Sequence, residues 1–161
     1  FEATDKGIDD DAVARLLAVT GGHPYGTQQL AYTTWELVPT GHYAHIADVE
    51  EATTKVLRGE HNHFARIWDD ASEHQRLVLL ALANEPGRPY SGEYQARHGL
   101  VSSTNVQRAL RALVEEELVG TTERGVYRVI EPFLAAWLER EQGEPPVARE
   151  LRTRAPRSPD R

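Results

Sequence analysis

A junction rich in glycine and proline constrains the fold of this chain more than any other feature. The segment Thr20–Leu30 reads TGGHPYGTQQL and separates two stretches of helical periodicity. Glycine reaches the left-handed conformation that ends many helices at low cost, so Gly21 and Gly22 predict a helix C-terminus. Pro24 suits the first turn of the next helix, where its missing N–H needs no partner. The sequence therefore predicts two helices joined by a tight turn.

Helical periodicity covers the rest of the N-terminal part as well. Asp9 and the two aspartates after it supply an N-cap and first-turn charges for the helix that leads into the turn. A third pattern runs from Asp48 to Trp68, as one long helix or as two helices broken near Gly59. We expect a small helical bundle over residues 1–70. The apolar spacing predicts that the buried face of the first helix consists of Val13, Leu16, Leu17 and Thr20.

The pattern changes in the C-terminal part, where three helical stretches precede two β-rich ones. Ser72 and Gln75 form a capping-box pattern, and strands are predicted at Val119–Thr122 and Val126–Ile130. The order helix, helix, helix, β-hairpin is typical of a winged helix-turn-helix. We therefore expect a mainly α fold, with a winged helix-turn-helix and its β-hairpin wing over residues 71–141. Ser91 is predicted to cap a short helix that ends at Gly99, and Ser102 or Ser103 is predicted to cap the next helix. The last predicted helix begins at Glu131-Pro132.

Composition limits the remaining possibilities. The chain has 161 residues, no cysteine and a formal net charge of -7, which excludes disulfides and thiolate metal sites and disfavours non-specific attraction to a phosphate backbone. No apolar run approaches the ~18 residues of a membrane span, so we expect a soluble, cytoplasmic protein without membrane contacts. The absence of methionine, even at position 1, leads us to expect a processed chain or an excised fragment.

The string TGGHPY resembles the Gly-x-Pro turn in the helical lid of STAND and AAA+-type P-loop ATPases. Further segments are similar to the same ATPase group in the same order, and the resemblance covers most of the chain before the tail. It implies that the chain is the lid and winged-helix part of an ATPase. The similar segments are Gln28–Ala31, Trp68, Gln75, Val78-Leu79, Leu82-Ala83, Tyr127–Val129, Glu131–Phe133 and Trp137.

In that family the turn packs against the adenine of the bound nucleotide. The resemblance thus places Gly22, His23 and Pro24 at an ATP or ADP molecule that the parent protein binds with Mg²⁺. The partner is then a missing N-terminal P-loop domain, because no Gly-x-x-x-x-Gly-Lys-Ser/Thr phosphate loop occurs in this chain. Arg15 or Arg66 could act as a lid arginine, and the sequence does not choose between them. From its residues alone, the turn also suits a plain helix junction without a ligand.

The predicted helix after Ser103 is the candidate recognition element for a nucleic acid. Asn105, Arg108 and Arg111 are predicted to point outward, where they could read base edges or hold phosphates. Against this, residues 72–141 carry eight arginines and ten glutamates without lysine or aspartate, a net charge of -2. A solvated or protein-binding face is therefore favoured. The alternative function is a DNA-binding transcriptional regulator whose N-terminal bundle senses a ligand or dimerises. The buried stripe of this helix is predicted to be Val106, Ala109, Leu110, Leu113 and Val114.

Two histidine pairs invite a metal-site hypothesis. His61 and His63 lie two residues apart on a helical pattern, so they point in nearly opposite directions. No third ligand accompanies His42 and His45 in the sequence. We therefore predict neither a metal site nor a catalytic residue in this chain, although the parent protein is expected to be an ATPase.

Residues 142–161 are rich in proline, arginine and glutamate and poor in apolar residues, which predicts a disordered tail. We predict that a chain ending at Gly143 keeps its fold and melts within about 2 °C of the full chain, because the tail has little apolar area to bury. Thermal melts of both chains, followed by circular dichroism, measure this. A clearly lower melting temperature of the shorter chain would show that the tail docks on the folded part.

Overall fold

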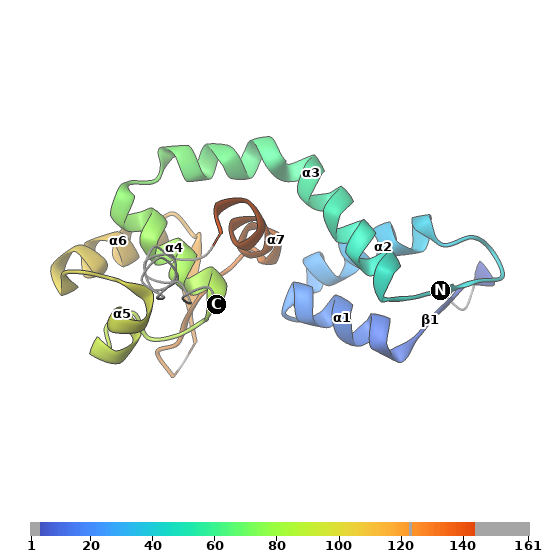
Figure 1. Ribbon diagram of the computed structural model, residues 1–161, viewed down its shortest axis with the longest axis horizontal. Coiled ribbons are helices and arrows are strands. Elements are labelled where there is room, and N and C mark those ends of the chain that lie inside the picture. The colour runs from blue at the N-terminus through green and yellow to red at the C-terminus, as the bar shows by residue number, and fades with distance from the viewer. Residues whose placement is uncertain (1–3, 123, 144–161) are drawn as a thin grey trace, which may run out of the picture. The chain divides into compact units, whose positions relative to one another are not determined.

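The computed structural model describes residues 4–122 and 124–143 of the chain. These residues are mainly helical and include two small two-stranded sheets (Figure 1). The chain divides into two compact units. The first unit holds the described residues up to Ile67 together with Glu131–Trp137, and the second holds Trp68–Ile130 with the described residues from Leu138 onward. Most of the predicted disordered tail lies outside the described residues.

The N-terminal segment of the first unit contains three helices and a short parallel pair of strands, and α7 (Pro132–Trp137) from later in the chain joins the same unit. β1 (Gly7–Ile8) pairs with β2 (Tyr43–Ala44), and the helices are α1 (Asp10–Thr20), α2 (Pro24–Leu37) and α3 (Ile46–Asp70), of which α3 continues past Ile67. Asp9 caps α1 as predicted, because its carboxylate accepts a hydrogen bond from the N–H of Ala12 at 2.6 Å. A hydrogen bond from His45 is the main cause that lowers the pKa of the Asp9 carboxyl. Of the two alternatives for the third helix, the single unbroken helix is right.

The buried side of α1 is narrower than the sequence pattern predicts. Ala12, Leu16 and Thr20 are buried, at a regular spacing of four residues. The prediction that Val13 and Leu17 share this buried face was wrong, because their side chains are 38% and 45% exposed. The apolar residues of α1 cover a wide face, but α1 packs on α2 and on α7 (Pro132–Trp137) along only one side of that face. An apolar pair on α1 is therefore left at the surface.

The second unit follows the order predicted from the sequence. Its helices are α4 (Glu73–Asn84), α5 (Gly92–His98) and α6 (Ser103–Glu115), and its hairpin joins β3 (Val119–Thr121) to β4 (Tyr127–Val129) in antiparallel register. Residues 78–83 of α4 are buried without a break, since α4 packs on α6, on β4 and on a π-helical turn, η2 (Leu138–Gln142). Gly87 forms a further antiparallel bridge to Tyr127, which ties the loop after α4 to the wing.

Capping explains where most of these helices begin. Ser72 and Gln75 form the predicted capping box of α4, and Ser91 caps α5 through the N–H of Tyr94. Ser102 occupies the N-cap position of α6 but makes no capping bond, and its φ is 75°, so the predicted serine cap of α6 was wrong. The prediction that Val114 is buried on α6 was also wrong, because it lies at the edge of the stripe and is 39% exposed.

A polar cluster fastens α5 to the end of α4. Glu85 follows α4 and accepts hydrogen bonds from Arg97 at 3.1 and 3.2 Å, and its carboxylate lies 3.0 Å from Nε2 of the buried His98. The hydrogen bond with His98 is the main cause that lowers the pKa of Glu85, and the charge of Arg97 acts in the same direction. The ring of Tyr94 packs on His98, and its hydroxyl donates to the backbone oxygen of Glu85 at 2.7 Å.

Two valines on α6 give a matched test of this packing. Val106 is 2% exposed and Val114 is 39% exposed, while both sit in the same helix. We predict that Val106→Ala lowers the free energy of unfolding by roughly 1–3 kcal/mol, because it removes buried methyl groups and leaves a cavity. Val114→Ala should change it by less than about 0.5 kcal/mol, with the same gain in helix propensity. Urea titration measures both, and equal effects would contradict the burial of α6 described here.

Candidate functional site

The turn between α1 and α2 is held in one conformation by its own backbone and caps. Gly21 ends α1 in the left-handed region at φ 57°, and Gly22 follows at φ 71°. The N–H of His23 donates to the carbonyl of Thr20 at 2.9 Å, and Nδ1 of His23 accepts from the N–H of Gly26 at 3.3 Å. Pro24 is the first residue of α2, as predicted. We call Gly21–Tyr25 the Gly-Pro turn.

The Gly-Pro turn is bare on its outer side. A Cβ atom placed on Gly21 or Gly22 meets no other atom within 4 Å, and both residues are exposed. Pro24 is exposed as well, and Tyr25 is 66% exposed. The turn therefore presents backbone, a proline ring and a phenol ring to a potential ligand. The predicted cofactor residues Gly22, His23 and Pro24 are thus contiguous at the surface, with His23 partly covered by its capping role.

Just behind the turn, the chain is closely packed. Gly26 is buried, and a Cβ placed on it would lie 2.9 Å from Cγ of Pro132 and 3.8 Å from the ring of Phe133. Glycine is required here for lack of space, whereas at Gly21 and Gly22 it is required by the backbone angles. A contact with the Glu-Pro-Phe segment at this glycine was not predicted from the sequence.

The exposed apolar pair on α1 leads toward the turn. Val13 and Leu17 are four residues apart, and the next position at this spacing is Gly21, so the three lie along one side of α1. Of the two arginines considered for a lid role, Arg15 forms an ion pair with Glu50 of α3, and Arg66 is exposed. This arrangement does not by itself assign either of them to a nucleotide.

The histidines serve structural roles. Nδ1 of His61 lies 3.1 Å from Nε1 of Trp137, which donates to it, and the two rings are in tilted contact. His45 contacts Asp9, and His42 lies 3.1 Å from the carbonyl of Thr40. Within residues 4–122 and 124–143, no group of three or more His, Cys, Asp or Glu side chains is arranged to hold a metal ion.

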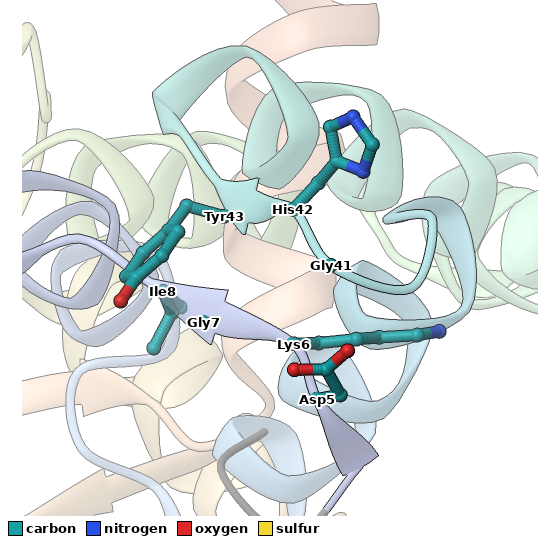
Figure 2. Close-up of a pocket in the computed structure, with 7 residues that line it drawn as sticks. All are labelled: Asp5, Lys6, Gly7, Ile8, Gly41, His42 and Tyr43. Atoms are coloured by element: carbon teal, nitrogen blue, oxygen red, sulfur yellow. The ribbon is translucent and has the colours of Figure 1, made fainter.

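A small cleft lies beside the β1–β2 pair, and it was not predicted from the sequence. It has a volume of about 330 Å³ (Figure 2). The ammonium group of Lys6 is engaged, because it donates to the carbonyl of Trp35 at 2.9 Å and lies 4.0 Å above the Trp35 ring. The two-residue strands that form the cleft carry no alternating pattern from which a sheet could be predicted. Its lining is Asp5, Lys6, Gly7, Ile8, Gly41, His42 and Tyr43.

Arginines gather where α6, the loop before α5 and the wing meet. Arg108 and Arg111 are exposed on α6, and Arg88 in the loop donates to the backbone oxygen of Arg124 in the wing at 3.3 Å. None of these four arginines forms an ion pair with another residue in the part of the chain that the structure describes. We call Arg88, Arg108, Arg111 and Arg124 the arginine face.

Two tyrosines lie within the arginine face. The rings of Tyr90 and Tyr127 meet edge to face at 5.8 Å between centroids, and Tyr90 is half exposed. Burial is the main cause that raises the pKa of Tyr90, its hydrogen bond with Tyr127 adds to this, and the charge of Arg111 opposes it. Arg111 therefore lies close enough to Tyr90 to act on it. Asn105, also predicted for nucleic-acid binding, is half-buried, and its side-chain amide lies 3.0 Å from Nε2 of His74.

Comparison with known proteins finds a winged helix domain in the C-terminal part of the chain. Residues 62–140 match a family described as a probable winged helix domain, and this match spans just under half of the chain. The predicted fold class, a mainly α chain with a helical bundle followed by a winged helix and its hairpin, is confirmed. No curated protein and no solved structure matches the chain. None of the helices in the described part is long and apolar enough to cross a membrane.

Proposed function

We propose that this chain is the lid and winged-helix part of a P-loop ATPase and that the Gly-Pro turn closes over the adenine of its nucleotide. The observation that carries the proposal is that the turn has a fixed backbone shape and an open outer side. Two left-handed glycines and the His23 cap fix its shape, and its outer side has open space at both glycines. The similarity of TGGHPY and the downstream segments to STAND and AAA+-type ATPases supports the same assignment.

The chemistry of the turn suits a flat heteroaromatic ring. Nucleotide pockets are lined mainly by apolar groups, and a purine gains from contact with flat apolar surfaces on its faces. The exposed Pro24 ring and the Tyr25 phenol supply such surfaces, and the missing side chains of Gly21 and Gly22 let a base approach the backbone. Val13 and Leu17 continue the apolar surface along α1, where a neighbouring domain can cover them.

Phosphoryl transfer itself depends on parts that this sequence does not contain. The phosphate loop and its lysine hold the phosphates, and Mg²⁺ neutralises their charge, so these belong to a P-loop domain of the same protein. The chain supplies the adenine contact and the winged helix, and the latter responds to the nucleotide state or binds a protein partner. On this proposal the isolated chain does not hydrolyse ATP.

The decisive substitution is at Pro24. We predict that Pro24→Ala in the ATPase that contains this chain weakens ADP binding roughly tenfold, because ring contact with the base is worth about 1–2 kcal/mol. The same change should cost about 1 kcal/mol or less in folding, since a first-turn residue needs no N–H partner. Gly22→Val should weaken ADP binding more, because it adds a branched side chain where the backbone meets the base. Isothermal calorimetry and thermal melts measure the two effects.

Pro39→Ala is the matched control, because Pro39 is exposed in the loop after α2. It should leave ADP affinity unchanged. If Pro24→Ala and Gly22→Val both remain folded and bind ADP like the unmodified protein, the turn is only a helix junction, and the proposed function is wrong.

A second candidate function is DNA binding by the winged helix, and the arginine face favours it. The arginine face has four exposed arginines without acidic partners among the described residues, and one of them, Arg111, acts on the half-exposed Tyr90. Arginine is the side chain best suited to phosphates and guanine edges. Three consecutive glutamates, Glu115 to Glu117, oppose it at the C-terminal end of α6. The winged-helix family by itself is compatible with DNA or with protein partners.

A duplex titration separates the two candidates. We predict weak or absent binding at physiological salt, because affinity for duplexes depends on neutralised phosphates and residues 72–141 are net negative. DNA binding would instead appear as a micromolar or tighter Kd with a steep salt dependence, and Arg108→Gln with Arg111→Gln would lower the salt slope by about two. Arg58→Gln with Arg66→Gln removes the same charge from exposed positions of α3 and serves as the control. Fluorescence anisotropy with a labelled duplex measures the affinity and the salt slope of all three proteins.

A further inference from the structure

The loop before α5 is tied to the wing, and the two together carry half of the arginine face. Gly87 exchanges two backbone hydrogen bonds with Tyr127 of β4, at 3.0 and 2.7 Å. The carbonyl of the buried Pro89 accepts a hydrogen bond from a side chain of α5 at 2.8 Å. The guanidinium of Arg88 donates to the backbone oxygen of Arg124. All of these residues belong to the second unit, so the loop and the wing form one connected surface.

Helix α6 supplies the other two arginines of the face. Arg108 and Arg111 are exposed and three residues apart, so they are neighbours on one side of the helix. Burial raises the pKa of Tyr90 and the charge of Arg111 opposes this rise, so the two side chains lie close to each other. The ring of Tyr90 in turn meets that of Tyr127 edge to face. Arg111 therefore connects α6 to the loop and the wing.

The arginines of this face differ from others in the same unit, whose charges are used within the fold. Arg97 pairs with two glutamates, and the guanidinium of Arg76 donates to two backbone carbonyls at 2.8 and 3.0 Å. Glu115 lies four residues after Arg111 on α6, yet the two form no ion pair in the described part of the chain. Like charges without acidic partners repel one another, and an incoming carboxylate relieves this repulsion. The face is thus complementary in charge to an acidic ligand.

The surroundings of the face suit a peptide better than a duplex. A duplex presents a long track of phosphates, and Glu115 to Glu117 at the end of α6 repel such a track. A short acidic segment can contact the arginines without reaching these glutamates. Arginine binds a carboxylate through two parallel hydrogen bonds, and both arginine and tyrosine are enriched where proteins meet. The bases of a duplex are stacked on each other, so the exposed ring of Tyr90 offers them little.

From these contacts we infer that the arginine face binds an acidic, extended segment of a partner protein, whose carboxylates pair with Arg108 and Arg111. The negative charge elsewhere in the unit repels such a segment and thereby confines it to this face. The inference names the chemistry of the protein partner that the proposed function leaves open for the winged helix. It does not depend on the ATPase assignment, because every contact that carries it lies inside the second unit.

Fluorescence anisotropy of the full chain with a fluorescein-labelled, glutamate-rich peptide at physiological salt tests the inference. We expect saturable binding that Arg108→Gln with Arg111→Gln weakens roughly tenfold or more, because two charge-assisted contacts are lost. Arg66→Gln with Arg128→Gln is the matched control, since it removes the same charge from exposed positions outside the face. Arg128 follows Tyr127 in β4, so its side chain points to the opposite side of the hairpin. The control should change the affinity by less than about twofold.

Three results would overturn the inference. The first is no saturable binding, or equal binding of a peptide with glutamine in place of every glutamate. The second is an equal loss of affinity in the double variant and the control, which would show diffuse charge attraction. The third is a labelled duplex that binds more tightly than the peptide and loses affinity in the double variant, which would make the face a nucleic-acid surface. Thermal melts check that all proteins are folded. The measurement involves no nucleotide, so its outcome is separate from the effect of Pro24→Ala on ADP binding.

Discussion

Burial of Phe133 and Trp137 in the first unit is the interaction on which the rest of the structure depends. Two large aromatic side chains from the C-terminal part of the chain complete a core that the residues up to Ile67 begin. Burying each is worth on the order of 2–3 kcal/mol, a large share of the stability of a small unit. Because both residues lie late in the chain, the core of the first unit is completed only by long-range contacts, such as the hydrogen bond from Trp137 to His61.

In the second unit, the positions of individual charged side chains matter more than the net charge. Glu85 engages both Arg97 and His98, and Glu93 also pairs with Arg97, so the α5 cluster satisfies its own charges. The arginine face receives no acidic partner from the described residues, although the region as a whole is net negative. A summed charge therefore does not describe what a partner meets at α6 and the wing. Because the arginine face lacks acidic partners among the described residues, DNA binding is retained as the second candidate function after the ATPase lid.

Local rules predicted the helices and the wing, and long-range packing decided the rest. The Asp9, Ser72 and Ser91 caps and the hairpin were predicted from the sequence, because each depends on residues within a few positions. The exposure of Val13 and Leu17 was not, since which flank of an apolar stripe is covered depends on elements far along the chain. The same limit applies to the β1–β2 pair and to the packing of Pro132 on Gly26. For the candidate site, the sequence predicted the turn and its proline but not what supports them.

The glycines in and just after the Gly-Pro turn explain how one short segment can have an open outer side and a closely packed inner side. Gly21 and Gly22 adopt backbone angles that other residues reach with strain, and this strain-free turn leaves the outer side open. Gly26 has ordinary helical geometry, but Pro132 occupies the space that any side chain would need. The open outer side of the turn and α7 on the inner side are then separated by a single turn of helix. Since the intervening backbone is fixed by the His23 cap, a change on one side has little room to relax before it reaches the other.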